Sequence, residues 1–155
     1  MAIVGFNFTK INAERKPVTE QNVNIESNAG VSNITELNSI DPKKTLIKFD
    51  FNYLCKFEPG LGKIEIAGEV VEIYDKDFAT KVLDYWKVEK KIYGEVLQDV
   101  FNNILARSNM EAIFISRELG LPSPIQMPRV DLKQVEKKEE KPKEEKVSKS
   151  DSKKK

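Results

Sequence analysis

The sequence predicts an α+β fold in which a four-stranded antiparallel sheet is followed by two helices. Three observations lead to this prediction. In the first half of the chain apolar residues alternate with polar ones, and short turn sequences separate the alternating segments. The spacing of the apolar residues then changes to about 3.6, which is the period of a helix. Strands joined by short turns pair antiparallel, and helices that follow them can cover one face of the sheet.

Two strands are predicted in the first 40 residues. Val4, Phe6 and Phe8 alternate with small or polar residues, and the alternation changes phase near Ile11, so we expect a bulge or bend there. A second, weaker strand begins near residue 23. Its apolar positions change phase before residue 34, and Asn, Ser and Gly interrupt it.

The third predicted strand is the segment TLIKFDFNYLCKF, residues 45–57. Every second residue from Ile47 onward is apolar, as expected for a strand with one buried face. Aromatic residues are 8% of the chain, yet this face carries four of them: Phe49, Phe51, Tyr53 and Phe57. They either belong to the core or line a surface that receives the apolar chain of another protein.

The fourth strand and the two helices follow a Pro-Gly-Leu-Gly turn at residues 59–62. Residues 63–74 alternate again, with Ile64, Ile66 and Val70 predicted to point inward. A first helix carries Phe78, Val82, Tyr85 and Trp86 on one face, and Asp75 or Asp77 can cap it. We expect the charged residues 87–91 to break or kink the helical segment. A second helix then runs from about residue 93 to residue 119, where Gly120 and two prolines end it.

The chain divides into one domain, residues 1–132, and a tail, residues 133–155. The tail holds ten lysines against six acidic residues and almost no apolar side chains, so we predict that it is disordered. The body before it carries a net charge of −3, since the whole chain has +1. The favoured interpretation of the tail is a solvated extension; the alternative is a weak contact with an acidic partner such as a nucleic acid or a ribosome surface.

The composition indicates a cytoplasmic binding protein without a cofactor. Cys55 is the only cysteine and lies on the apolar face of its strand, which is typical of a reducing compartment and of a small buried side chain. We expect neither a signal peptide nor a membrane-spanning helix, because no apolar run approaches about 20 residues. The sequence has no histidine, so a metal site or a histidine-assisted nucleophile is not expected, and we predict that the protein is not an enzyme.

Residues 102–132 resemble the carboxy-terminal part of the SecB family of protein-export chaperones. In that family a long helix is followed by a glycine, a proline-containing turn and an extended stretch, and matching residues here are Arg117, Gly120, Pro122, Pro124, Ile125 and Pro128. The segment IEIAGEVVEI, residues 64–73, is similar to the last strand of the family, and the order of elements agrees over residues 1–132. The resemblance implies a dimer of dimers that holds unfolded polypeptides, without ATP, in apolar grooves lined by aromatic residues.

This resemblance suggests a peptide-binding role for the aromatic residues. The candidates are Phe49, Phe51, Tyr53 and Phe57 of the third strand, together with Phe101 of the second helix. The alternative is that these rings only support the packing of the helices. Family members that deliver clients to the SecA motor have a strongly acidic sheet surface and an acidic tail. This chain has a near-neutral body and a lysine-rich tail, so docking to SecA is not expected, and some relatives serve toxin–antitoxin systems instead.

We also expect the protein to be a homodimer or homotetramer. An apolar edge strand needs a cover, because sheet edges pair readily with other chains. Two aromatic residues beside a charged segment resemble an interface with an apolar centre and a polar rim. The predicted interface residues are Ile3, Val4, Phe6, Phe8, Tyr85 and Trp86.

A different class of function remains open on the sequence. The protein could be an adaptor or structural subunit that binds one folded partner, or a ribonucleoprotein through its lysine-rich tail. Binding of nucleic acid through the tail would weaken steeply with salt, whereas binding in an apolar groove would change little.

Overall fold

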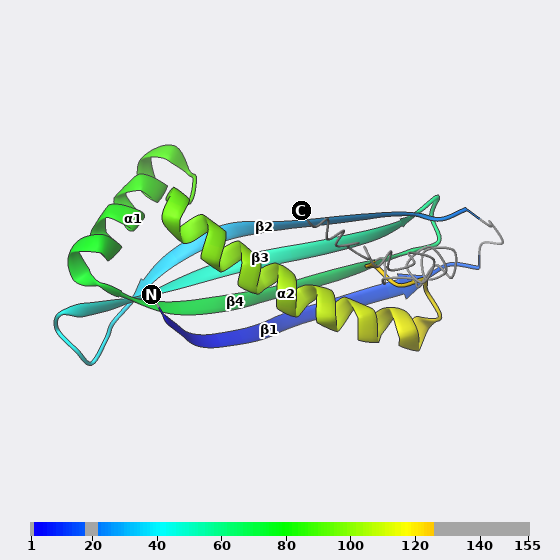
Figure 1. Ribbon diagram of the computed structural model, residues 1–155, viewed down its shortest axis with the longest axis horizontal. Helices are drawn as coiled ribbons and strands as arrows, with labels where there is room; N and C mark the ends of the chain where they lie inside the picture. Colours follow the sequence, from blue (N-terminus) through cyan, green and yellow to red (C-terminus); the bar gives the residue numbers. More distant parts are fainter. Residues whose placement is uncertain (1, 18–21, 126–155) are drawn as a thin grey trace, which may run out of the picture.

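The computed structural model describes residues 2–17 and 22–125, which form one antiparallel sheet with two helices on the same face (Figure 1). In chain order the elements are β1 (Ala2–Arg15), β2 (Asn24–Leu37), β3 (Lys44–Glu58), β4 (Gly62–Asp75), α1 (Lys76–Glu89) and α2 (Gly94–Leu119). The strands lie in the order β1-β4-β3-β2, so β3 and β4 are central and β1 and β2 are the edges. The predicted α+β fold is confirmed. The predicted tail, residues 133–155, lies outside the described residues.

Both edge strands contain the irregularities that their sequences indicated, with one difference. The register of β2 with β3 shifts between Val31 and Asn33, as expected. In β1 one shift falls between Phe8 and Lys10, close to the predicted position. A second, unpredicted shift surrounds Val4, which is therefore displaced from the alternation and is 59% exposed.

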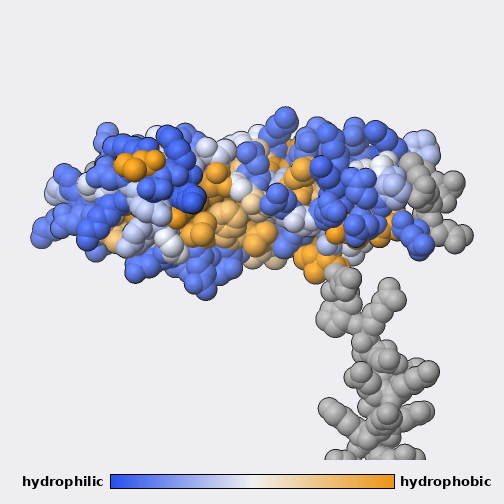
Figure 2. All heavy atoms as spheres, turned by 90° about the horizontal axis from the view of Figure 1, so that it is seen from above, coloured by the Kyte–Doolittle hydropathy of each residue, from blue (hydrophilic) through white to orange (hydrophobic). Residues whose placement is uncertain are grey.

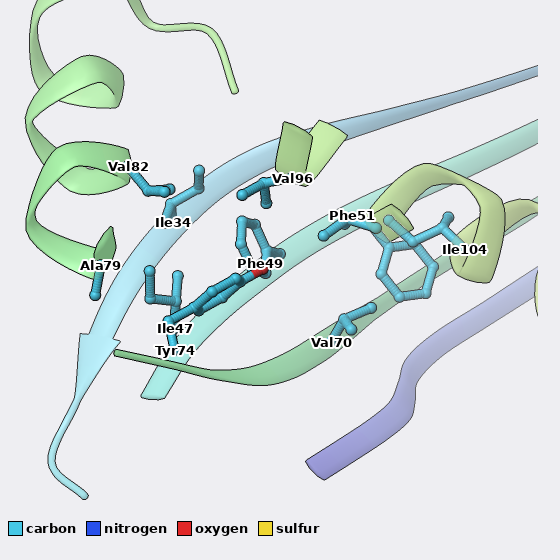
Figure 3. Packing of buried hydrophobic residues seen from close by; sticks show 11 residues of the cluster. Ile34, Ile47, Phe49, Phe51, Val70, Tyr74, Ala79, Val82, Val96 and Ile104 are labelled. Carbon is cyan, nitrogen blue, oxygen red and sulfur yellow. The ribbon is translucent and has the colours of Figure 1, made fainter. Parts of the chain in front are cut away.

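The core lies between the sheet and the helices. The inward residues of β3, from Ile47 to Phe57, are at most 1% exposed, and the outward residues between them are half-buried or exposed. Figure 3 shows Phe49 and Phe51 among side chains that come from both helices and from the two neighbouring strands. The predicted half-buried character of this strand is confirmed.

The charged segment breaks the helical region into two helices, as expected. α1 ends at Glu89, where Lys90 adopts a left-handed conformation with φ of 53°, and α2 begins at Gly94. Gly120 ends α2 with φ of 63°, a conformation that glycine adopts at little cost. α1 stands at one end of the sheet, and α2 runs obliquely across its face (Figure 1).

The contact of α2 with the sheet repeats every fourth residue. The buried residues of this helix are Val96, Val100, Ile104, Ser108, Ala112 and Ser116. Large side chains thus fill the interface in the amino-terminal half of the helix, and small ones follow in the other half. The small side chain of Ala112 leaves room for large inward residues of β3 and β4, and it packs in one cluster with Tyr53, Phe57 and Ile64.

Candidate functional site

The flank of α2 that faces β1 is largely polar. The guanidinium carbon of Arg107 lies 4.7 Å from the centre of the Phe6 ring, and Nη1 of Arg15 in β1 donates a hydrogen bond to the carbonyl oxygen of Leu119, 3.0 Å away. These two contacts fix which side of the helix lies over β1. Residues on the same side, at intervals of four, are Glu95, Asp99, Asn103, Arg107 and Glu111. This side of the helix therefore presents three carboxylates, one amide and one guanidinium.

The opposite flank of α2, toward β2, is apolar. It is formed by Leu97, Phe101, Leu105 and Ile113, again at intervals of four, and Asn109 interrupts the row. The side chain of Asn109 has a hydrogen-bond partner, because the hydroxyl of Tyr53 donates a hydrogen bond of 2.8 Å to its Oδ1. Leu97 is 40% exposed, and the other three apolar residues are half-buried. We call these four residues the α2 flank.

The edge strand β2 presents small and medium-sized apolar residues beside the amino-terminal part of the α2 flank, since α2 runs obliquely from β2 toward β1 (Figure 1). Ile25, Ala29 and Val31 pair with inward residues of β3, so they share the helix-covered face of the sheet, and each is half-buried. Leu105 packs against the same cluster as Ile25 and Ala29. The α2 flank and these three β2 residues together form what we call the apolar band. Figure 2, which views the molecule from the β2 side, shows apolar atoms gathered in the middle of this side and smaller apolar groups toward both ends.

The structure places the five predicted peptide-binding residues in two different environments. Phe49, Phe51, Tyr53 and Phe57 are at most 1% exposed and lie beneath the helices. Phe101 is half-buried and belongs to the apolar band. The β3 rings can therefore contact a peptide only after α2 moves, whereas Phe101 is accessible without rearrangement. A binding role for all five stays a prediction.

The predicted interface residues also divide between core and surface. Ile3, Phe6 and Phe8 of β1 are half-buried and pack against the core, and Val4 is exposed at the bulge. Tyr85 is partly exposed and meets Tyr93 edge-on, with ring centres 5.8 Å apart, while Trp86 packs against the core. Their role in self-association stays a prediction.

Two exposed residues of α2 were not among the predicted surface residues. Met110 is 61% exposed and Phe114 is 56% exposed, and they lie one turn apart on the side of the helix opposite the sheet. The sequence did contain a signal, because the segment MEAIFI, residues 110–115, is apolar on nearly all sides of a helix. Such a segment is typically covered on more than one side.

An unexpected carboxyl group lies in the core. Glu72 of β4 is 2% exposed and occupies the same face as Ile66 and Val70, and the hydroxyl of Tyr74 donates a hydrogen bond to it. Burial raises the pKa of Glu72, and the negative charge of Asp99 on α2 raises it further, while the Tyr74 hydrogen bond opposes the shift. Burial, followed by the proximity of Glu72, also raises the pKa of Tyr74. The folded protein therefore binds a proton at Glu72 more tightly than the unfolded chain does.

We expect Glu72→Gln to stabilise the protein at neutral pH but not in acid. Because the pKa is raised on folding, the stabilisation that protonated Glu72 contributes is fully present below the unfolded pKa of about 4.3. This contribution is lost as the pH rises through the folded pKa of Glu72. Glutamine has no proton to lose, so the difference in melting temperature between variant and wild type should grow as the pH rises above about 4.3 and through the raised pKa of Glu72.

Glu65→Gln is the matched control, since Glu65 lies on the solvent face of the same strand. A hydrogen bond from Lys63, at 3.1 Å, lowers the pKa of Glu65, so its loss should not produce a gain at neutral pH. A constant difference between Glu72→Gln and wild type at every pH would contradict the assignment of this carboxyl group.

The remaining chemistry of the described residues is sparse. Cys55 is buried, the hydroxyl of Ser27 points to its sulfur at 3.6 Å, and burial raises the pKa of the thiol. Among residues 2–17 and 22–125 there is no group of three or more Cys, Asp or Glu side chains arranged to hold a metal ion. Within that same part of the chain, neither helix is long and apolar enough to cross a membrane.

The chain was compared with protein-family models, curated proteins and solved structures. No protein-family model matches the chain, and no curated protein matches it. Among solved structures, the chain is similar to a SecB-like chaperone of Mycobacterium tuberculosis in complex with a ChAD peptide from an antitoxin. The TM-score is 0.46 and the identity 9%, over 84% of this chain and 90% of that chain.

Proposed function

We propose that this protein is an ATP-independent holdase that binds unfolded segments of other polypeptides on the apolar band. The observation that carries the proposal is the band itself. Large apolar side chains of α2 remain accessible in a domain whose inward β3 residues are at most 1% exposed. The resemblance of residues 102–132 to the SecB family supports the same function.

The chemistry of the band suits a binding site for many different sequences. Contacts with aliphatic and aromatic side chains depend on buried apolar area and little on the identity of the partner residue. A fully buried aliphatic or aromatic side chain contributes roughly 1.5–3 kcal/mol. A few such contacts give useful affinity to an unfolded chain and leave it free to dissociate.

We propose further that the protein acts in the cytoplasm as a homodimer or homotetramer. The exposed residues Val4, Met110 and Phe114 are apolar and lie away from the apolar band on β1 and on the outward side of α2. Covering them with a second copy would leave the band free for unfolded polypeptides. This arrangement involves no catalytic step and no cofactor.

The expected result in a functional assay is that the wild type suppresses aggregation of an unfolded test protein without nucleotide. The double variant Leu97→Ala/Phe101→Ala should lose most of this effect, because it removes two of the four side chains of the α2 flank. Light scattering of a heated or diluted test protein gives the measurement. Thermal melts of each variant must accompany it, since Phe101 is half-buried.

Val88→Ala is the control, because Val88 is an exposed apolar residue that lies on α1 and not in the band. It should suppress aggregation as well as the wild type does. No suppression by the wild type, or equal suppression by the folded double variant, would reject the proposal. Suppression that disappears between low and physiological salt would favour the adaptor that binds through its lysine-rich tail.

A further inference from the structure

We propose that the bound polypeptide joins the sheet as an additional strand on the free edge of β2. This inference rests on the proposed holdase function and specifies how the client is held. Backbone hydrogen bonds to the edge would add to the apolar contacts with the α2 flank. Both kinds of interaction tolerate many sequences.

The edge of β2 is available for pairing. β2 is the last strand of the sheet, and among the described residues it pairs with β3 alone, so its other side presents unpaired backbone groups. Residues 24–31 keep an unshifted register with β3. The whole strand from Asn24 to Leu37 contains no Lys, Arg or Pro, the residues with which natural sheets commonly protect an edge.

In the amino-terminal half of α2, which lies nearest β2 (Figure 1), the spacing of the α2 flank is close to that of an extended chain. Residues four apart on a helix are separated by about 6 Å along its axis. Alternate residues of a strand are separated by about 6.6 Å and point to the same face. A strand added beside β2 would direct every second side chain to the helix-covered face. Leu97, Phe101 and Leu105 lie on that side of α2 at a corresponding interval.

The other sheet edge fits this role less well. On the helix-covered face β1 already carries Phe6 and Phe8, and these rings pack against each other with centres 5.2 Å apart. The side of α2 above β1 carries charges, and Arg107 lies over Phe6. An apolar side chain arriving there would meet charged groups. The inward residues of β2 include Ser27 and Ala29. Because these side chains are small, apolar surface next to them remains free for contact with an added strand.

Backbone methylation of a model peptide tests the inference. The probe is a peptide of about ten residues, the length of a long natural strand, in which leucine or phenylalanine alternates with serine or lysine. Two further versions carry N-methyl groups on the apolar residues or on the polar residues. In a strand the backbone groups of successive residues point to opposite edges, so each version blocks one edge.

Strand addition predicts an asymmetric result. One methylated version should bind at least about tenfold more weakly than the unmodified peptide, because several hydrogen bonds of roughly 1 kcal/mol each are lost. The other version should bind within a few-fold of the unmodified peptide. The identity of the weak version then gives the direction of the added strand. Fluorescence anisotropy with the full chain measures all three affinities.

The alternative outcomes are distinguishable. Equal binding of all three peptides, or an equal loss of affinity with both methylated versions, would overturn strand addition. The holdase function would still be tested separately by aggregation suppression and its dependence on Phe101. If the unmodified peptide binds only by dissociating the protein's own oligomer, a second copy occupies the edge and the inference is wrong. Failure of the unmodified peptide to bind, together with no suppression of aggregation, would overturn both proposals.

Discussion

Phe51→Ala is expected to lower the free energy of unfolding by about 3–5 kcal/mol, the usual cost of removing a buried aromatic ring. The Phe51 side chain is 1% exposed. Its ring centre lies 5.3 Å from that of Phe6 and 6.4 Å from that of Phe8, so it joins β3 to the edge strand β1. Loss of the ring would leave a cavity between the sheet and α2. Urea unfolding followed by circular dichroism measures the change.

Two further variants test whether the loss of stability comes from the missing volume of the buried ring. Phe51→Leu keeps most of the volume and should cost less than about 1.5 kcal/mol. Asn52→Ala, on the opposite face of the same strand, should change stability by no more than about 0.5 kcal/mol. If Phe51→Ala were as stable as the wild type but failed to hold an unfolded protein, Phe51 would be a binding residue and not a core residue.

Gly68→Ala is expected to destabilise the protein by about 1–3 kcal/mol, as overpacking of a core typically does. A methyl group at residue 68 of β4 would approach two atoms of the Phe51 ring to 2.7 and 2.8 Å and would also meet the carbonyl oxygen of Asn7. The backbone oxygen cannot move without disturbing the pairing of β1 with β4. Gly68 therefore provides the space that the Phe51 ring occupies.

Gly30→Ala is the matched control for this substitution. Gly30 is also in a strand, but no atom lies within 4 Å of the position that its Cβ would take, so alanine should be neutral or slightly stabilising. The double variant Gly68→Ala/Phe51→Leu should lose less stability than the two single variants predict together, because the shared clash is relieved. Strict additivity would contradict the proposed contact between residue 68 and the Phe51 ring.

The elements of the fold could be predicted because their signals are local. Alternation in residues 45–57 and 63–74 gives the two central strands, and the glycine at residue 120 gives the end of α2. The bulge at Val4 had no such signal. The bulge displaces Val4 from a row of alternating apolar side chains. The same sequence would fit a regular strand, so only the pairing with β4 reveals the bulge.

The candidate site was less predictable because it depends on contacts between distant segments. The sequence marks the β3 aromatics and Phe101 equally as apolar, yet α2 covers the β3 rings and leaves Phe101 at the surface. The two flanks of α2 are visible as rows in the sequence, but the contacts of Arg107 with Phe6 and of Arg15 with Leu119 are needed to show which one faces β2. The burial of Glu72 could not be predicted for a similar reason, since an acidic residue in an alternating strand is normally placed on the solvent side.

The strand order β1-β4-β3-β2 affects how the protein folds during its synthesis on the ribosome. β1 is synthesised first, but its only strand partner among the described residues is β4, which follows β2 and β3 in the chain. Translation proceeds at roughly 5–20 residues per second, so β1 waits on the order of several seconds for that partner. During this time Ile3, Phe6 and Phe8 have no sheet to cover them. During its own synthesis, the protein therefore exposes apolar side chains of the kind that it is proposed to bind in other unfolded chains.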